Sequence, residues 1–191
     1  MLKSVRVFNI LNDRRFNMKR SIGTQERLYP NPVVLVTSSF DGVDNIITLA
    51  WTGTVCSKPP MISISVRPSR YSNELISGSK EFAINIPTSN QVDICNFCGM
   101  NSGRDLDKFK KLGLTKDKPI KINTPLIKEC PINIECTVKS ITNLGVHDLI
   151  IGEVLSVTCD EEIIYEDGDI DYDKLDIISY CMGKYFKNSM I

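Results

Sequence analysis

Residues 45–72 read NIITLAWTGTVCSKPPMISISVRPSRYS, and this stretch decides both the fold class and the site that we expect. It predicts two polar-lined strands joined at the corner Pro59-Pro60. From residue 62 to residue 67, isoleucine and valine alternate with serine and arginine, so one face of the second strand is apolar and the other carries hydrogen-bond donors. This alternation is common in any antiparallel sheet, so the rest of the chain must decide whether it has a function.

The turn after the second strand is rich in groups that bind anions. Arg70 and a tyrosine precede Ser72, which we interpret as the N-cap of a short helix. The free amides of a helix start, with arginine and serine side chains, form a phosphate site without a glycine-rich loop. A second such place is the segment SGRD at residues 102–105, where Arg104 and Lys108 lie around a predicted helix start.

Composition limits the class of protein. The chain has 191 residues, 42% hydrophobic and 24% charged, which predicts one soluble globular domain. Its 23 basic and 23 acidic residues balance, so we expect no nucleic-acid or membrane-surface partner. The chain shows neither a long apolar run nor a signal-peptide pattern, which predicts a cytoplasmic protein. Seven irregularly spaced cysteines are typical of reduced core thiols.

Apolar alternation along the rest of the chain predicts a mainly β protein with a few short helices. The expected strands cover residues 33–37, 45–55, 81–87, 132–143 and 147–157, with a hairpin turn at 40–42. Gly152 lies within the last strand, where a glycine marks a bulge or a close approach by another group. The expected helices cover residues 90–98, ended by Gly99, and 105–112, ended by Gly113. Many antiparallel strands with few helices indicate a closed barrel.

Three local patterns could suggest metal or catalytic chemistry. The acidic segment 160–176 lacks the glycine and glutamate that a calcium loop needs, so we expect a solvated loop. Cys95 and Cys98 have zinc or redox spacing, but no second pair accompanies them, and both fall on one helix face, which favours core packing. We therefore expect no metal site. The only histidine, His147, opens a strand after a turn, which by itself says little about catalysis.

Seven separated motifs give the chain a family resemblance. They are YPNPVVLVTSS, N-x-x-T-x-A-W-x-G, S-x-P-P-x-x-S-I-S-V-R-x-S-R-Y-S, F-x-I-N-I-P, SGRDxDKF, GLT and G-x-H-x-x-x-x-G-E-V. Their order and spacing resemble the flavin-reductase-like, flavoredoxin-type family of FMN-binding split barrels. The resemblance implies a homodimer of six-stranded, antiparallel, Greek-key-like split barrels with FMN at the subunit boundary. It makes residues 18–191 one domain and leaves residues 1–17 as an extension, either a short arm or a start-site overcall.

The resemblance also implies roles for individual residues. Asn45, Thr48, Trp51 and Thr52 would lie along the flavin ring and ribityl chain, and Ser65, Arg67, Arg70 and Ser72 would hold the phosphate. Further FMN contacts would be Ser102, Arg104, Lys108 and Tyr180, and His147 would lie beside the ring as the catalytic residue. A phosphate monoester carries between one and two negative charges, which two or three cations and several hydroxyls balance.

For activity, the resemblance implies an NAD(P)H-dependent flavin reductase that passes electrons from NADH or NADPH through FMN to an acceptor. Two alternatives stay open: a flavoredoxin-like carrier reduced by a protein donor, and a non-redox flavin-binding module. The chain contains neither a Rossmann GxGxxG motif nor a ferredoxin-type cysteine set. A nicotinamide would therefore have to stack on the flavin in an open cleft.

Overall fold

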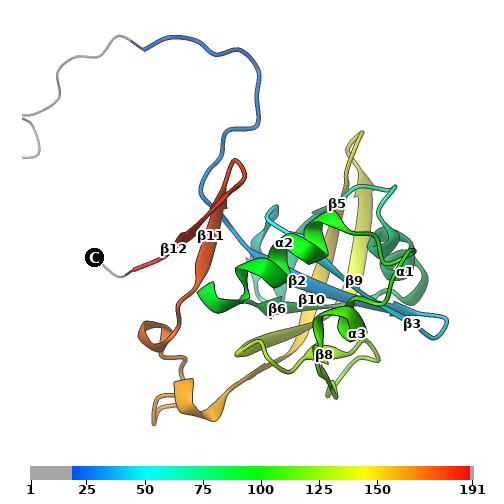
Figure 1. Ribbon diagram of the computed structural model, residues 1–191, viewed down its shortest axis with the longest axis vertical. Coiled ribbons are helices and arrows are strands. Elements are labelled where there is room, and N and C mark those ends of the chain that lie inside the picture. The colour runs from blue at the N-terminus through cyan, green and yellow to red at the C-terminus, as the bar shows by residue number, and fades with distance from the viewer. Residues whose placement is uncertain (1–18, 190–191) are drawn as a thin grey trace, which may run out of the picture.

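The computed structural model describes residues 19–189, so the expected extension at residues 1–17 lies outside the described residues. Its main element is a seven-stranded antiparallel sheet of order β3-β2-β6-β9-β10-β5-β4 (Figure 1). The strands are β2 (Val34–Phe40), β3 (Val43–Leu49), β4 (Thr52–Ser57), β5 (Pro60–Val66), β6 (Glu81–Ile86), β9 (Ile132–Asn143) and β10 (Asp148–Cys159). The mainly β prediction is thus confirmed.

The sheet curls into a barrel that stays open at one seam. Its edge strands β3 and β4 are consecutive in the chain and separated only by Ala50 and Trp51. Neighbouring strands lie about 4.8 Å apart, so two residues cannot cross a flat sheet of this width, and the two edges must come together. None of the strand pairs between residues 19 and 189 joins β3 to β4, which makes the barrel a split one.

The prediction of a single strand over residues 45–55 was wrong. The chain changes edges at Ala50 and Trp51, so residues 45–72 form three strands, and the main sheet has seven strands where six were expected. β3 pairs with β2, whereas β4 pairs with β5. The Ser65 amide donates to the Trp51 carbonyl at 2.9 Å, which fixes the crossing.

Both faces of β2 are buried, which explains the continuous β-branched run in this part of the chain. Val34 and Val36 belong to the apolar core inside the barrel, together with Phe82 and Ile150. Leu35 lies on the opposite face of β2 and belongs to a second core, to which α2 and α3 contribute side chains. The hairpin turn at Asp41-Gly42, with positive φ at both residues, confirms the predicted turn.

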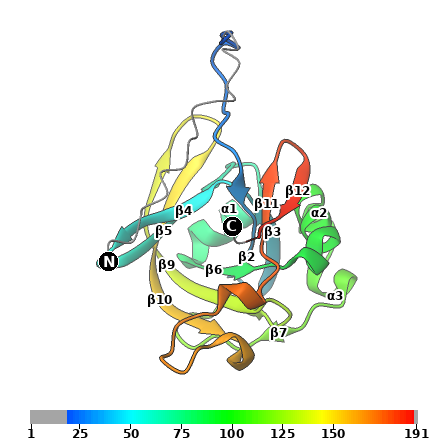
Figure 2. The same ribbon diagram turned by 90° about the vertical axis from the view of Figure 1, so that its left-hand side faces the viewer.

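Residues 19–189 form three α-helices: α1 (Tyr71–Ser79), α2 (Val92–Met100) and α3 (Lys108–Leu112). In Figure 2, α2 and α3 lie beside the barrel, whereas α1 is framed by its strands and contributes Ile76 to the core inside it (Figures 1 and 2). Two predicted helix starts were wrong. Arg70 occupies the N-cap of α1, and Ser72 lies one residue inside the helix, where its hydroxyl bonds to a strand instead of capping. The helix expected over 105–112 begins only at Lys108, because the Asp107 carboxylate caps it by accepting from the Lys110 amide at 3.1 Å.

The other predicted helix was displaced. It was expected over residues 90–98 and ended by Gly99, but α2 starts at Val92, after the 3-10 turn η1 (Ser89–Gln91), and runs through Gly99 to Met100. The start is delayed because the Gln91 side chain accepts from the Thr88 amide at 2.9 Å and stabilises η1. Gly113, with a φ of 67°, ends α3 as predicted.

Gly152 confirms both features expected of a glycine within a strand. The register of β10 against β9 shifts between Ile151 and Gly152, which is a bulge. A Cβ atom at position 152 would lie 2.5 Å from Cζ of Phe82, which is fully buried. Only a glycine lets the ring of Phe82 pack on this strand.

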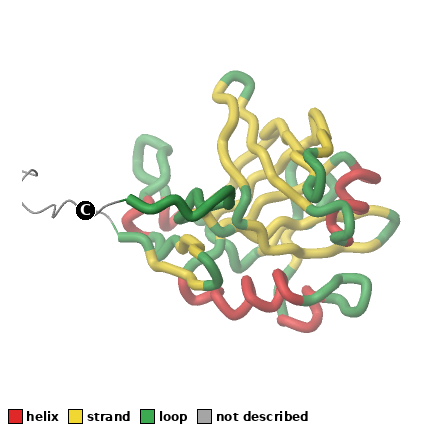
Figure 3. Tube along the Cα trace, turned by 90° about the horizontal axis from the view of Figure 1, so that it is seen from above, coloured by secondary structure: helices red, strands yellow, loops and turns green. Residues whose placement is uncertain are grey.

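The remaining elements surround the barrel. A small sheet joins β1 (Asn31–Pro32) to the hairpin of β11 (Ile178–Cys181) and β12 (Lys184–Lys187), and a second one pairs β7 (Lys116–Asp117) with β8 (Leu126–Ile127). The acidic segment is mostly exposed and contains the short turns η2 (Glu161–Ile163) and η3 (Tyr172–Lys174). Residues 19–28 extend away from the barrel as an exposed strand-free segment (Figure 1). Seen from above, strands make up most of the barrel, and helices and loops lie around them (Figure 3). None of the helices that the structure describes is long and apolar enough to cross a bilayer.

Candidate functional site

Two small cavities run one after the other along β3 and form one groove. The first, about 190 Å³, is lined by Asn45, Arg70, Ser72, Ser102 and Lys108, and we call it the lysine cavity. The second, also about 190 Å³, is lined by Thr48, Trp51, Ser65, Arg67 and His147, and we call it the tryptophan cavity. Ile47, Arg70 and Gly99 line both cavities, so the two adjoin. The groove thus brings together every site residue predicted from the sequence except Thr52, Arg104 and Tyr180.

Lys108 places a positive charge at the floor of the lysine cavity. The Asp107 cap starts α3 at this residue, whose side chain is buried with 3% of its surface exposed. Its Nζ donates to the carbonyls of Ile46 at 2.6 Å and Cys98 at 2.8 Å. An ammonium has three donors, so one is left for a ligand. Burial, with a smaller effect of nearby Arg70, lowers the pKa of Lys108.

The positive charges of the groove lack carboxylate partners. The ion pairs formed within residues 19–189 include neither Lys108, Arg67 nor Arg70. Unpaired charges close together repel one another, and an anion in the groove would relieve that repulsion. The arrangement therefore favours a ligand with a concentrated negative charge at this end.

Asn45 offers the lysine cavity an unused acceptor. Its Nδ2 donates to the Ser72 hydroxyl at 2.9 Å and so joins β3 to α1. Its Oδ1 is buried without a hydrogen-bond partner among the described residues. A Cβ atom at Gly103 would lie 2.1 Å from this oxygen, so the loop can pack here only with glycine. A buried acceptor is costly to leave unpaired, and a ligand hydroxyl would satisfy it.

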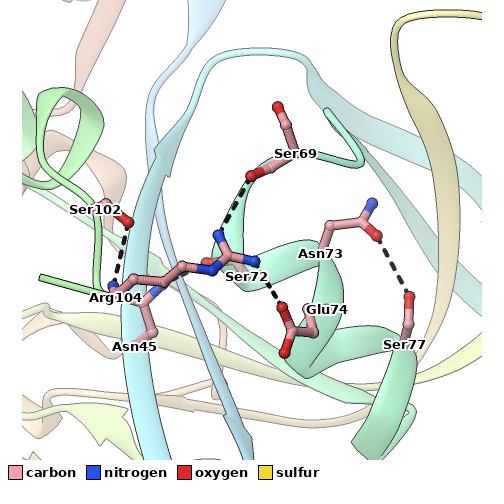
Figure 4. A network of polar contacts seen from close by, with 8 residues as sticks. All are labelled: Asn45, Ser69, Ser72, Asn73, Glu74, Ser77, Ser102 and Arg104. Atoms are coloured by element: carbon pink, nitrogen blue, oxygen red, sulfur yellow. Dashed lines mark hydrogen bonds and ion pairs between the residues drawn. The ribbon is translucent and has the colours of Figure 1, made fainter.

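Arg104 lies at the rim and lines neither cavity of the groove. Figure 4 shows its side chain crossing from the Ser102 loop to the start of α1. Its Nη2 pairs with Glu74 Oε2 at 2.6 Å, and its Nη1 donates to the Ser69 carbonyl at 3.4 Å. The guanidinium also lies over the Tyr71 ring, 4.7 Å from its centroid. Arg104 therefore ties the loop to the helix, and Glu74 already neutralises its charge.

The tryptophan cavity holds the single tryptophan and the single histidine of the chain against each other. The ring centroids of Trp51 and His147 are 4.8 Å apart, with an interplanar angle of 43°. Partial burial and then the positive charge of Arg67 lower the pKa of His147. Its ordinary value is about 6.5, so the imidazole is neutral at pH 7. One ring nitrogen then donates and the other accepts.

The other predicted residues lie around this groove. Thr48 donates its hydroxyl to the Cys95 carbonyl at 2.6 Å, and Thr52 donates to the Ser63 carbonyl at 2.8 Å. Thr52 lines a larger cavity of about 810 Å³, shared with residues 25–29, that adjoins the tryptophan cavity at Trp51. Tyr180 lines a cavity of about 430 Å³ that adjoins the groove at Thr48.

The predicted core role of Cys95 and Cys98 is confirmed. Both are fully buried on α2 in the second core. Burial raises the pKa of Cys95 to about 12 and that of Cys98 to about 11. Both thiols are therefore protonated at neutral pH, and a thiol is a poor nucleophile and a poor metal ligand in that form.

Sequence reasoning missed three polar residues that shape the groove: Asn73, Glu74 and Asp148. None of them gives a signal in the sequence. The structure buries the side of β10 that carries Asp148 and Ile150, whereas the apolar alternation in the sequence predicts that the other side is buried, the side of Leu149, Ile151, Leu155 and Val157.

A family described as the flavin reductase like domain matches residues 26–176 of this chain. The chain belongs to the flavin reductase-like family. Similar proteins agree with this assignment. An uncharacterised protein of Archaeoglobus fulgidus is 32% identical over 161 residues, which cover 84% of this chain and 89% of the relative.

Solved structures give the same result. The flavoredoxin of Desulfovibrio vulgaris (Miyazaki F) is 32% identical and covers 91% of this chain and 95% of its own, with a TM-score of 0.85. A Shewanella frigidimarina protein with a split barrel domain, 19% identical, covers 84% of this chain and 83% of its own, with a TM-score of 0.77. The second likeness shows the fold alone, and it confirms the predicted split barrel.

Proposed function

We propose that this protein binds FMN in the groove and acts as an NAD(P)H-dependent flavin reductase, which passes electrons through FMN to an acceptor. The observation that carries the proposal is a set of three cations, Lys108, Arg70 and Arg67, that have no carboxylate partner among residues 19–189 and lie beside the paired rings of Trp51 and His147. Membership in the flavin reductase-like family supports the reaction class.

The residues of the groove fit the parts of FMN. Lys108, Arg70 and the hydroxyls of Ser72 and Ser102 suit a phosphate, which needs positive charge and donors. The unpaired Oδ1 of Asn45 suits a ribityl hydroxyl. The ring would then lie toward the tryptophan cavity, with Thr48, Thr52, Ser65, Arg67 and Tyr180 as further contacts. Arg104 would act at the rim through the Ser102 loop that it holds.

FMN, when bound, supplies the hydride and electron chemistry that no side chain of the protein provides. The protein would bind FMN and orient it. Arg67 and the neutral His147 give the tryptophan cavity donors and no negative charge, which suits a ring that becomes more negative on reduction. We assign His147 the catalytic role of orienting the nicotinamide or donating a hydrogen bond beside the ring.

A second candidate function is a flavoredoxin-like carrier that a protein donor reduces. The observation that favours it is the 32% identity to a flavoredoxin over 91% of the chain. Both functions use the same groove, and they differ in the source of electrons. A reductase needs access for a nicotinamide beside the ring, whereas a carrier needs only an exposed edge.

One experiment tests the proposal and separates the two candidates. The purified protein is mixed with FMN, desalted, and treated without oxygen first with NADH and then with NADPH, while the flavin absorbance is recorded. A retained band that bleaches within seconds supports the reductase. Retention without bleaching supports the carrier, and loss of the flavin contradicts a prosthetic FMN. The variant His147→Ala should retain FMN and bleach more slowly.

We also propose that the protein forms a homodimer in the cytoplasm. Apolar side chains are exposed around the 810 Å³ cavity between the N-terminal segment and β4, including Leu28 at 87% and Val55 at 52%. Surfaces of this kind commonly mark protein interfaces. Size-exclusion chromatography with light scattering measures the molar mass of the protein in solution. The mass of a single chain at micromolar concentration would contradict the dimer.

A further inference from the structure

A buried carboxylate connects the two ends of the groove. Asp148, the first residue of β10, is 9% exposed and forms no ion pair within residues 19–189. Its Oδ2 accepts from Nδ2 of Asn73 at 2.9 Å, and its Oδ1 accepts from Nδ2 of Asn143 at 2.8 Å. Both oxygens of the carboxylate are therefore used, each by a different element.

The first partner belongs to the phosphate end. Asn73 directly follows Ser72 in the first turn of α1, and its own oxygen accepts from the Ser77 hydroxyl at 3.5 Å (Figure 4). Because Ser72 and the N-cap residue Arg70 line the lysine cavity, the bond from Asn73 fixes the helix start that carries them.

The second partner belongs to the histidine end. Asn143 is the last residue of β9, and its Oδ1 accepts from the Gly145 amide at 3.1 Å inside the turn that leads to His147. The turn closes where the Leu144 amide donates to the His147 carbonyl at 2.8 Å. Asp148 is the next residue, so its carboxylate holds the turn at the base of the imidazole.

We propose that Asp148 is a positioning residue, whose carboxylate fixes His147 against Trp51 and fixes that pair relative to the phosphate end of the groove. The effect of Asp148 on turnover rests on the proposed function. Its effect on the contact between His147 and Trp51 does not. Only a carboxylate offers two acceptor oxygens to two amide donors. In Asp148→Asn an amide nitrogen would face another amide nitrogen, so one of the two bonds is lost while the shape is kept.

The single tryptophan provides a readout that needs no flavin. A protonated imidazole 4.8 Å from an indole accepts an electron from its excited state and quenches the fluorescence. Wild-type fluorescence should therefore fall as the pH is lowered through the pKa of His147, which burial and Arg67 hold below the usual value. The variant His147→Ala should show no such fall, because His147 is the only histidine.

The test compares this pH response in the wild type, in His147→Ala and in Asp148→Asn. We expect Asp148→Asn to lose at least about half of the response, because the imidazole is no longer held beside Trp51. Asp160→Asn is the matched control and should respond like the wild type. Asp160 lies just beyond the far end of β10, and its carboxylate makes no hydrogen bond or ion pair with any residue from 19 to 189. The proposal would be overturned if Asp148→Asn and Asn143→Ala, which releases the turn itself, both fold and both keep the full wild-type response.

A second measurement separates this inference from the proposed function. In the FMN-loaded protein, Asp148→Asn should slow reduction by NAD(P)H about tenfold. It should change the dissociation constant of FMN by less than about threefold, so the substitution affects the rate of reduction more than the binding of FMN. If no variant reduces FMN but the fluorescence response is lost as expected, the reductase is contradicted and the positioning role stands. If circular dichroism shows that Asp148→Asn does not fold, Asn143→Ala, which releases only the turn, must lose the response instead.

Discussion

Lys108 is the residue on which the anion site depends most. Its ammonium is buried and has one donor left over, and a hydrogen bond to a charged group contributes about 1.5–3 kcal/mol. We expect Lys108→Met to weaken FMN binding about 10-fold to 100-fold. A fluorescence-quenching titration with FMN measures the change. Lys110→Met, on the exposed side of the same helix, is the control and should bind FMN like the wild type.

The pH dependence of FMN binding has a definite sign at this residue. Burial lowers the pKa of Lys108 below the usual lysine value of 10.5, so its proton is lost at a pH where exposed lysines keep theirs. A bound phosphate favours the charged form. FMN affinity should therefore fall as the pH rises toward the usual pKa of lysine, and in Lys108→Met this fall should be absent. An equal fall in both proteins would assign it to another group.

At the scale of elements, the pair formed by Arg104 and Glu74 joins the Ser102 loop to α1 across the rim of the groove. The two side chains are 45% and 61% exposed, and an exposed pair contributes about 0–1 kcal/mol. Neither Arg104→Ala nor Glu74→Ala should lower the melting temperature much. We expect the pair to affect the charge around the phosphate end of the groove, and so FMN binding, rather than stability.

A double-mutant cycle decides how Arg104 acts. Arg104→Ala leaves the Glu74 carboxylate without its partner near the phosphate end, so we expect FMN binding to weaken about threefold to tenfold. Removing Glu74 as well should restore the affinity to within about twofold of the wild type. If Arg104 touched the phosphate directly, the double variant would bind as weakly as Arg104→Ala. Titrations at low and high salt measure all four proteins.

The strand β10 carries a packing prediction. In Gly152→Ala the new Cβ atom would lie 2.5 Å from Cζ of Phe82 and 3.0 Å from Cβ of Cys136, both of which are fully buried. Overpacking of this kind costs about 1–3 kcal/mol, which lowers the melting temperature of a domain of this size by several degrees. Gly53→Ala on β4 is the control, because nothing lies within 4 Å of its Cβ position. Equal melting temperatures for the two variants would contradict this packing.

The elements themselves were mostly predictable. Alternating apolar residues identified the bounds of β6, β9 and β10 within a residue or two. For β6 and β9 the alternation also identified the face in the core, whereas β10 places the opposite face, with Ile150 and Val154, in the core. The break at Ala50-Trp51 was not visible, since the residues on both sides are typical of strands. It depends on which strand each side pairs with, because Leu49 pairs with Val34 of the preceding strand and Thr52 pairs with Ile64 of the following one. Helix starts moved because Thr88 and Asp107 formed local caps that the helical pattern does not reveal.

For the whole molecule, closure of the barrel is what assembles the site. The crossing at Ala50-Trp51 places β3 beside the end of β5, so Thr48 and Arg67 line one cavity. Motifs in the sequence identified most of the residues that line the groove, because each motif is a short continuous segment that lines the groove as a unit. The contacts that support the groove were not predictable. Arg104 and Glu74 are 30 positions apart, and Asn73 and Asp148 are 75 positions apart, so only the folded chain brings them together.

The central claim is that the cations of the groove hold the phosphate of FMN, and a comparison of FMN with riboflavin tests it most directly. Riboflavin has the same ring and ribityl chain and lacks only the phosphate. We predict that the protein binds FMN at least about 100-fold more tightly than riboflavin in titrations at low salt, and that the difference shrinks at high salt. Equal affinities for the two flavins would show that Lys108, Arg70 and Arg67 do not form a phosphate site.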